Sequence, residues 1–281
     1  MRPLYLKARY RLPWGGREVF LKVFHAASGG KRAFVRRQAS RERASLSILR
    51  GLAVPALVRL TPDSLRRLLG FRPAAYLAQE FVPGASLRKA GLPPTEQIGA
   101  WLFLLEQLAA FRRRGVLQTD LKPSNVMVTR KPLSARHVDF NLATAVRSSR
   151  EYPESWFGYT VGYQAPEQGI AARVTERALT YQLGMLLAAG WLGADNSTLM
   201  GENAALARLR RELRRLGSPG LARLVGDCLS LSPGARPADY GEALERAKAL
   251  RSRGLPAAAL RVWEELRAPY AGALAKSRLR W

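Results

Sequence analysis

Residues 115–128 constrain this sequence more than any other stretch. Asp120, Lys122 and Asn125 stand at short, fixed offsets in a polar loop between apolar runs, and Asp139 follows nineteen residues after the first aspartate. Moving a terminal phosphate requires a carboxylate that orients the attacking hydroxyl, a cation on the transferring group and oxygen ligands for magnesium. The four side chains offer these groups in that order. The pattern therefore indicates phosphoryl-transfer chemistry.

The loop resembles the catalytic loop of protein kinases. That loop usually reads H-R-D-L-K-P-x-N, and residues 118–125 read Q-T-D-L-K-P-S-N. Residues 139–141 read D-F-N and resemble the family's D-F-G, with an asparagine that enters left-handed conformations more readily than most residues. Gln118 and Thr119 replace the usual His and Arg. Since that arginine normally binds a phosphate on the activation segment, this mode of switching is not expected here.

The resemblance implies a role for each polar residue. Asp120 is expected to orient the acceptor hydroxyl and take its proton, while Lys122 and Thr160 order the site around the transferred phosphate. Asn125 and Asp139 are expected to hold Mg²⁺. Thr160 matches the threonine near the end of the family's activation segment.

The end of that segment is also present. Residues 165–167 read A-P-E, and residues 232–237 resemble a later R-P motif. Arg236 is therefore expected to form a buried ion pair with Glu167. Leu179 stands where the family carries a helix aspartate that braces the catalytic loop around the arginine, which is also missing.

Two further residues are expected to hold the nucleotide phosphates. Residues 18–24 are β-branched and aromatic with one lysine, which predicts a strand, and Lys22 resembles the lysine of the family's V-A-I-K strand. Glu42 opens a helical pattern over residues 42–49 and is the expected partner of Lys22.

Residues 76–87 resemble the segment that joins the two lobes of a kinase. Glu80 and Val82 are expected to bind adenine through backbone groups, with Gln79 in the gatekeeper position. This expectation rests on register, because such contacts depend little on side chains.

The residues before Lys22 are fewer than the resemblance requires. Kinases carry a strand, a G-x-G-x-x-G turn and another strand there, whereas residues 4–10 and the turn at 13–16 account for one hairpin. We expect the first strand and the glycine-rich loop to be missing. Three explanations stay open: another element covers the nucleotide, the numbered start lies inside a longer protein, or ATP binding is weak.

The order of the motifs predicts an α+β chain with the two-lobed protein-kinase-like fold. Residues 1–250 are expected to form the kinase-like domain, with a small, sheet-rich N-lobe at 1–82, truncated at its start, and a larger helical C-lobe at 83–250. Residues 251–281 are expected to form a basic C-terminal extension, whose amphipathic helix at 257–266 packs on the C-lobe. A length of 281 residues, 47% of them apolar, suits this size.

Composition limits the location. The apolar run at 183–192 is too short for a membrane span, and no apolar segment follows the basic N-terminus, so a signal peptide is not expected. Cys228 lies in an apolar helical pattern and is expected in the core, and neither His25 nor His137 is expected to be catalytic. The predicted location is the cytoplasm.

The net charge of +25 predicts a surface that attracts polyanions. No aromatic residue interleaves with the arginines of 208–215 and no RNA-binding or zinc-finger signature occurs, so nucleic acid is a disfavoured partner. A solvated basic surface is the default, and an anionic membrane face or an acidic protein is the alternative. The matching alternative location is peripheral, at the inner membrane surface.

The predicted function is ATP- and Mg²⁺-dependent phosphoryl transfer to Ser/Thr hydroxyls of a protein substrate. One alternative is a small-molecule or glycan kinase, for example for lipopolysaccharide sugars, which would more often lack the A-P-E segment. A second is a pseudokinase that serves as a binding scaffold. It would explain the missing glycine-rich loop but would not require the polar site residues.

Overall fold

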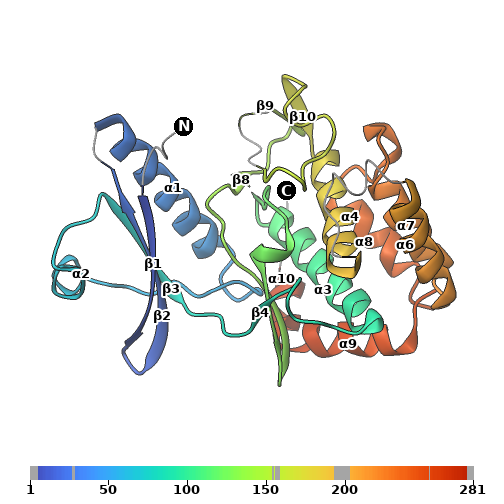
Figure 1. Ribbon diagram of the computed structural model, residues 1–281, viewed down its shortest axis with the longest axis horizontal. Coiled ribbons are helices and arrows are strands. Elements are labelled where there is room, and N and C mark those ends of the chain that lie inside the picture. Colours follow the sequence, from blue (N-terminus) through green and yellow to red (C-terminus); the bar gives the residue numbers. More distant parts are fainter. Residues whose placement is uncertain are drawn as a thin grey trace.

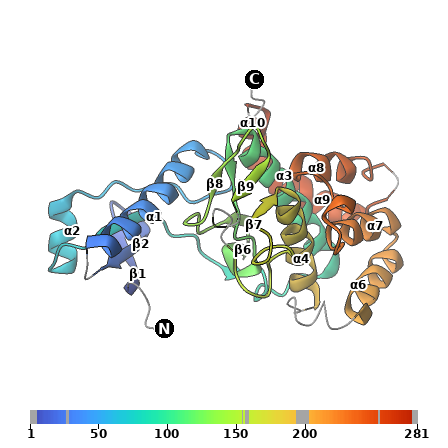
Figure 2. The same cartoon turned by 90° about the horizontal axis from the view of Figure 1, so that it is seen from above.

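A computed structural model of the chain describes residues 6–26, 29–153, 155, 159–192, 203–252 and 254–276. These residues form a small lobe around a three-stranded sheet and a larger helical lobe, which lie at opposite ends of the molecule in two perpendicular views (Figures 1 and 2). The predicted α+β, two-lobed architecture is confirmed. The start of the predicted first hairpin, residues 4 and 5, and the end of the basic extension, residues 277–281, lie outside the described residues.

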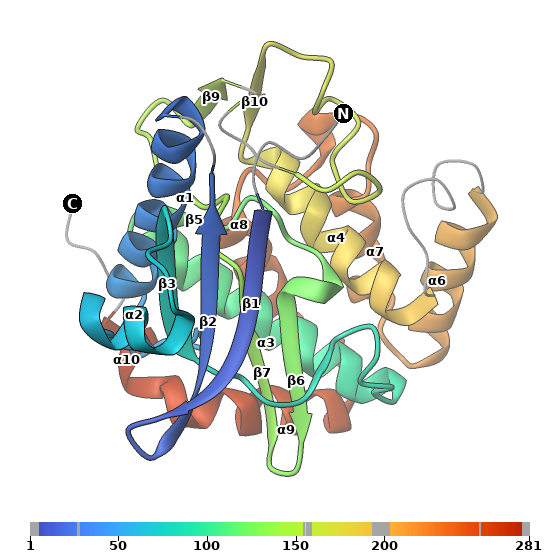
Figure 3. The same cartoon turned by 60° about the vertical axis from the view of Figure 1, so that its left-hand side comes forward.

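The small lobe is built on an antiparallel sheet with the order β1-β2-β3. β1 (Leu6–Trp14) and β2 (Arg17–His25) form the predicted hairpin, and β3 (Ala75–Glu80) pairs with the other edge of β2. Gly15 and Gly16 close the hairpin with φ of 58° and 75°, values that favour glycine. Figure 3 shows β1 and β2 running side by side in front of the helical lobe.

Two helices cover this sheet. α1 (Gly29–Ile48) begins well before the predicted start at Glu42, because Val35 and Ala39 continue the same buried face among exposed arginines and pack against Phe24. α2 (Pro62–Leu69) was not predicted from the sequence pattern. Its start is nevertheless encoded locally, since the Thr61 side chain accepts a hydrogen bond from the Ser64 amide at 3.1 Å.

The large lobe surrounds two long, buried helices, α3 (Pro94–Arg113) and α4 (Arg177–Leu192). β5 (Val116–Leu117) follows α3 and delivers the chain to the catalytic loop. The other elements before α9 are β4 (Ala85–Ser86), η1 (Pro123–Asn125), β6 (Val126–Arg130), β7 (Leu133–His137), β8 (Thr144–Ala145), β9 (Glu151–Pro153), β10 (Arg173–Thr175), α6 (Asn203–Arg215), α7 (Pro219–Cys228), η3 (Pro233–Ala235) and α8 (Tyr240–Lys248). Cys228 is buried as expected, and burial raises the pKa of its thiol to about 12.

The segment after residue 250 packs on the large lobe, as predicted. It contains α9 (Ala257–Arg267), η4 (Ala268–Tyr270) and α10 (Ala271–Lys276). α9 crosses beneath α3 (Figure 1), and Trp263 is buried there with its Nε1 donating to Glu106 Oε2 at 3.0 Å. Gly99 permits the close approach, because a Cβ at this position would lie 2.6 Å from the Ala259 carbonyl oxygen.

Candidate active site

A cavity of about 370 Å³ lies between the two lobes. Its walls come from β1, β2, the end of β3 and the segment after it in the small lobe, and from the catalytic loop, β6 and residues 138–139 in the large lobe. The lining residues are Arg9, Phe20, Lys22, Gln79, Glu80, Phe81, Val82, Lys122, Ser124, Asn125, Met127, Val138 and Asp139. The cavity thus collects most of the site residues that the sequence predicts.

Lys22 and Glu42 form a buried ion pair at this cavity, with 2% and 0% of their side chains exposed. Lys22 Nζ donates to Glu42 Oε1 at 2.5 Å and to Asp139 Oδ1 at 3.0 Å. Glu42 Oε1 also accepts a hydrogen bond from the Phe140 amide at 3.1 Å. The predicted partnership of Lys22 and Glu42 is therefore present, and it joins α1, β2 and the Asp139 segment.

Asp139 adopts the left-handed backbone conformation, with φ of 64°. Aspartate reaches this region at lower cost than most residues, and the Gln118 side chain fixes the position by donating to the Asp139 carbonyl at 3.1 Å. Lys7 Nζ lies 3.8 Å from the carboxylate. Burial raises the pKa of Asp139, but the charges of Lys22 and Lys7 outweigh burial and lower it. Asp139 is thus a carboxylate at neutral pH.

Asp120 is the centre of a second cluster. Its Oδ1 accepts a hydrogen bond from Thr160 Oγ1 at 2.7 Å, and its Oδ2 accepts from Lys122 Nζ at 2.7 Å. Lys122 Nζ also lies 2.5 Å from the Thr160 hydroxyl oxygen. Asn125 Nδ2 donates to the Asp120 carbonyl at 2.9 Å and to Oδ2 at 3.1 Å. The structure thus brings the four residues together.

The Asn125 segment also lies against the Asp139 segment. The Val138 amide donates to the Asn125 carbonyl at 2.8 Å, and both Asn125 and Asp139 line the cavity. The side-chain nitrogen of Asn125 makes the bonds to Asp120, and no described residue donates to its side-chain oxygen. The amide oxygen of Asn125 and the carboxylate of Asp139 therefore offer oxygen ligands for a metal ion at this end of the cavity.

Two hydrogen bonds from uncharged side chains support the catalytic loop. Gln182 of α4 accepts a hydrogen bond from the Leu121 amide at 3.1 Å, and so supports the catalytic loop from the helix in which Leu179 replaces the expected aspartate. Thr119 Oγ1 donates to the Leu142 carbonyl at 2.6 Å. Sequence reasoning missed Gln182, although a polar side chain inside an apolar helix is a recognisable signal.

The segment between the lobes begins at Glu80. The Glu80 amide donates to the Ala56 carbonyl at 2.7 Å, and no described residue accepts a hydrogen bond from the Val82 amide. The Glu80 side chain instead pairs with Arg136 of β7, through bonds of 2.7 and 2.8 Å. Burial alone would raise the pKa of Glu80. The hydrogen bonds from Arg136 and from the Ala56 amide outweigh burial, so the pKa lies below its usual value. This pair links the two lobes. No sequence motif indicates it.

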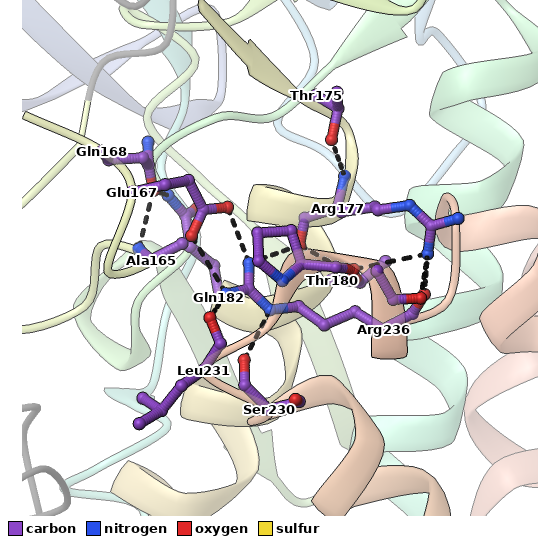
Figure 4. A network of polar contacts seen from close by, with 12 residues as sticks. Ala165, Glu167, Gln168, Thr175, Arg177, Thr180, Gln182, Ser230, Leu231 and Arg236 are labelled. Atoms are coloured by element: carbon purple, nitrogen blue, oxygen red, sulfur yellow. Dashed lines mark hydrogen bonds and ion pairs between the residues drawn. The ribbon is translucent and has the colours of Figure 1, made fainter. Parts of the chain in front are cut away.

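Arg236 forms the predicted buried pair with Glu167. The guanidinium is 0% exposed and donates to both carboxylate oxygens, at 2.7 and 3.0 Å. Figure 4 shows that it also reaches backbone carbonyls of Ser230 and Leu231, at 2.7 and 3.2 Å. The pair ties the end of the A-P-E segment to the loop that follows α7.

The residues around the cavity fit a nucleotide with Mg²⁺. Apolar side chains, among them Val82 and Met127, offer contacts for a flat base, and the Val82 amide is a free donor among the described residues. No three His, Cys, Asp or Glu side chains cluster as metal ligands in the described ranges. Mg²⁺ commonly uses one or two protein oxygens together with waters and phosphates, which Asn125 and Asp139 can provide.

Comparisons with known proteins agree with this geometry. The chain is 30% identical over 229 residues to the serine/threonine-protein kinase pkn2 of Myxococcus xanthus, a match that covers 75% of this chain and 26% of the relative. It is 34% identical over 123 residues to the serine/threonine-protein kinase PknG of Mycolicibacterium smegmatis, covering 42% and 15% of the two chains. The chain belongs to the protein-kinase-like superfamily. No family model matches it.

This kinase-like chain spans no more than about a quarter of the length of these relatives. A third relative, the serine/threonine-protein kinase Pkn1 of Myxococcus xanthus, is 35% identical over 124 residues, which cover 41% of this chain and 18% of Pkn1. Among the described helices of the kinase-like chain, none has both the length and the apolar character that crossing a membrane requires.

Proposed function

We propose that this chain catalyses ATP-dependent phosphoryl transfer to serine or threonine hydroxyls of a protein substrate. The observation that carries the proposal is the joint contact of Lys122 and Thr160 with the Asp120 carboxylate. Lys122 also lines the cavity that contains Lys22 and Asp139. A carboxylate for the acceptor, a cation for the transferred group and oxygen ligands for a metal are the groups that this reaction needs.

In the proposed reaction Asp120 orients the acceptor hydroxyl and takes its proton as the oxygen attacks. Lys122, held between Asp120 and Thr160, places a positive charge beside the transferred group. Bound ATP would supply the phosphoryl group, and Mg²⁺ would neutralise charge on its phosphates. Asn125 and Asp139 would hold the Mg²⁺.

The nucleotide would be held from both lobes. Lys22, fixed by Glu42, would bind phosphate oxygens, since a lysine held by a buried carboxylate presents its charge in one place. Backbone groups of Glu80 and Val82 would bind the base. The Val82 amide, which has no acceptor among the described residues, supports this part of the proposal.

A protein acceptor is supported by the surface next to Asp120. Val161 follows Thr160 and is 81% exposed, although it is apolar. The ordered A-P-E segment, held by Glu167 and Arg236, continues from it. An exposed apolar side chain beside the catalytic group suits a peptide better than a sugar. The names of the relatives agree with a protein acceptor.

The test is transfer of radiolabelled phosphate from ATP with Mg²⁺, to the chain itself and to generic basic and acidic proteins. Asp120→Asn should lower the transfer rate at least about 100-fold, because it removes the base without changing the shape. Asp227→Asn is the matched control, since Asp227 lies on α7 and pairs with the exposed Arg246. Transfer by Asp120→Asn at the wild-type rate would contradict the proposal, as would the absence of transfer to protein by the wild type.

A second variant tests the metal ligands. Asp139→Ala should abolish Mg²⁺-dependent transfer while the chain remains folded, because the carboxylate lies at the cavity edge with 22% of its side chain exposed. The melting temperature reports the fold independently of activity. Normal transfer by Asp139→Ala would show that the metal is held elsewhere.

The partner of the basic surface is also part of the proposal. Four arginines of α6, Arg210, Arg211, Arg214 and Arg215, line a hollow of about 590 Å³. We expect this cluster to attract an acidic protein or an anionic membrane face, and we expect the chain to act in the cytoplasm or at the inner membrane surface. Cosedimentation with phosphatidylserine vesicles should fall in high salt and on changing the four arginines to glutamine. Equally strong binding to neutral vesicles would contradict an electrostatic contact with the membrane.

A further inference from the structure

β1 carries two cations, Lys7 and Arg9, and Arg9 lines the cavity between the lobes. Lys7 and Arg9 are two residues apart, so their side chains leave the same face of the strand. In the β1–β2 register Arg9 lies directly opposite Lys22, so both side chains lie on one face of the hairpin. Arg9 and Lys22 both line the cavity.

Lys7 joins this group through Asp139. Its Nζ lies 3.8 Å from Asp139 Oδ2, while Lys22 Nζ lies 3.0 Å from Oδ1, so two lysines share one carboxylate. The Lys7 side chain is only 14% exposed, and its Nζ stands 5.5 Å from the centre of the Phe24 ring. It is therefore a fixed, half-buried charge rather than a mobile surface lysine.

The charges of this group do not balance. Lys7, Arg9 and Lys22 face Asp139 and Glu42, and no salt bridge of Arg9 occurs among the described residues. Like charges opposite each other on paired strands are destabilising. The group thus carries one more positive than negative charge, and the exposed Arg9 places that charge at the cavity between the lobes.

The glycines of the hairpin do not supply this anion site. Gly15 and Gly16 lie at the far end of β1, in the turn between Trp14 and Arg17, and neither lines the cavity. A glycine-rich phosphate loop works through backbone amides. The described small lobe offers side-chain ammonium and guanidinium groups instead, and both are strong phosphate ligands.

We propose that Lys7 and Arg9 bind the phosphate groups of the nucleotide together with Lys22. This inference rests on the proposed function, because it takes the cavity to be the nucleotide site. It assigns phosphate recognition to the strand before the lysine strand, and it explains why two further cations stand next to the pair of Lys22 and Asp139.

The experiment compares the binding of adenosine and of the non-hydrolysable analogue AMP-PNP with Mg²⁺ to the full chain, by calorimetry. Lys7→Met and Arg9→Gln should each weaken AMP-PNP binding about tenfold and leave adenosine binding unchanged, since each removes one charge-assisted contact to phosphate. Arg11→Gln is the matched control: Arg11 lies on the same strand face but pairs with Glu18 at 2.6 Å. It should bind both ligands as the wild type does.

Lys7→Arg keeps the charge and should retain most of the AMP-PNP affinity, which separates a phosphate contact from a structural effect. Melting temperatures of all variants check the fold. The inference is overturned if Lys7→Met and Arg9→Gln bind AMP-PNP as tightly as the wild type, or if adenosine affinity falls in parallel. A wild type that binds no AMP-PNP overturns both this inference and the proposed function. If only this inference is wrong, Asp120→Asn should still lower the rate of phosphate transfer.

Discussion

Two glutamines hold the catalytic loop through uncharged hydrogen bonds. Gln118 donates to the carbonyl of Asp139, and Gln182 accepts from the amide of Leu121. An amide side chain has both a donor and an acceptor and does not titrate, so it can reach either backbone group without a charge. These two contacts therefore hold the loop in a way that depends neither on pH nor on a bound phosphate.

His137 is the residue that should make the fold sensitive to acid. It is fully buried in β7, its Nδ1 has no hydrogen-bond partner among the described residues, and burial lowers its pKa to about 4. In the unfolded chain the ring of His137 has its ordinary pKa of about 6.5. Below that pH the unfolded chain binds a proton that the folded chain does not bind, so acid favours unfolding. We expect His137 to lower the free energy of unfolding by about 2 kcal/mol between pH 7 and pH 5.

Urea unfolding at both pH values measures this loss. His137→Gln removes the titrating ring and should show a smaller loss of stability over the same interval, even if it is less stable at pH 7. His25→Gln is the control, since this ring is half-buried beside Phe71 rather than enclosed in the core. An equal acid effect in the wild type and in His137→Gln would show that another group is responsible.

At the scale of elements, the contact between α3 and α9 requires a residue without a side chain. A Cβ on Gly99 would lie 2.6 Å from the Ala259 carbonyl oxygen and from Val262. Gly99→Ala should therefore lower the free energy of unfolding by about 1–3 kcal/mol, although alanine favours helix by up to about 1 kcal/mol. The urea midpoint, with an unchanged slope, measures the effect.

Gly272→Ala in α10 is the matched control for this change. No atom lies within 4 Å of a Cβ placed there, so alanine should leave stability unchanged or raise it. Equal stability changes in the two variants would mean that helix propensity, and not the approach of α9 to α3, decides the outcome.

At the scale of the whole molecule, a few polar links join parts that are distant in the sequence. Glu80 and Arg136 connect the two lobes, and Glu167 and Arg236 connect the A-P-E segment to the loop after α7. The second pair is the more buried, since the Arg236 side chain is shielded from solvent. Its removal should therefore affect the large lobe as a unit.

Glu167→Ala should lower the free energy of unfolding by about 3–5 kcal/mol, because it leaves a buried guanidinium without its carboxylate. Arg236→Met alone should also destabilise the chain. The double variant should cost less than the sum of the single changes, since it leaves neither charge unpaired. Denaturant unfolding of the four proteins measures the coupling. Additive effects would show that the two side chains contribute independently.

Much of this arrangement could be predicted because short motifs carry it. The partnership of Lys22 with Glu42 and of Arg236 with Glu167 follows from residues whose spacing resembles that of a known family. The link between Glu80 and Arg136 could not be predicted, because the fold alone brings together residues that share no motif. The division of the chain at residues 82 and 250, and the catalytic and ligand roles, stay predictions.

The position of Trp263 has a consequence for the order in which the molecule is made. Its indole is buried against α3 and bonded to Glu106, which lies 157 residues earlier in the chain. A ribosome adds residues in order, so this face of α3 has no partner until α9 has emerged. Until α9 has been synthesised, the large lobe exposes an apolar surface. A chaperone would be needed during this interval.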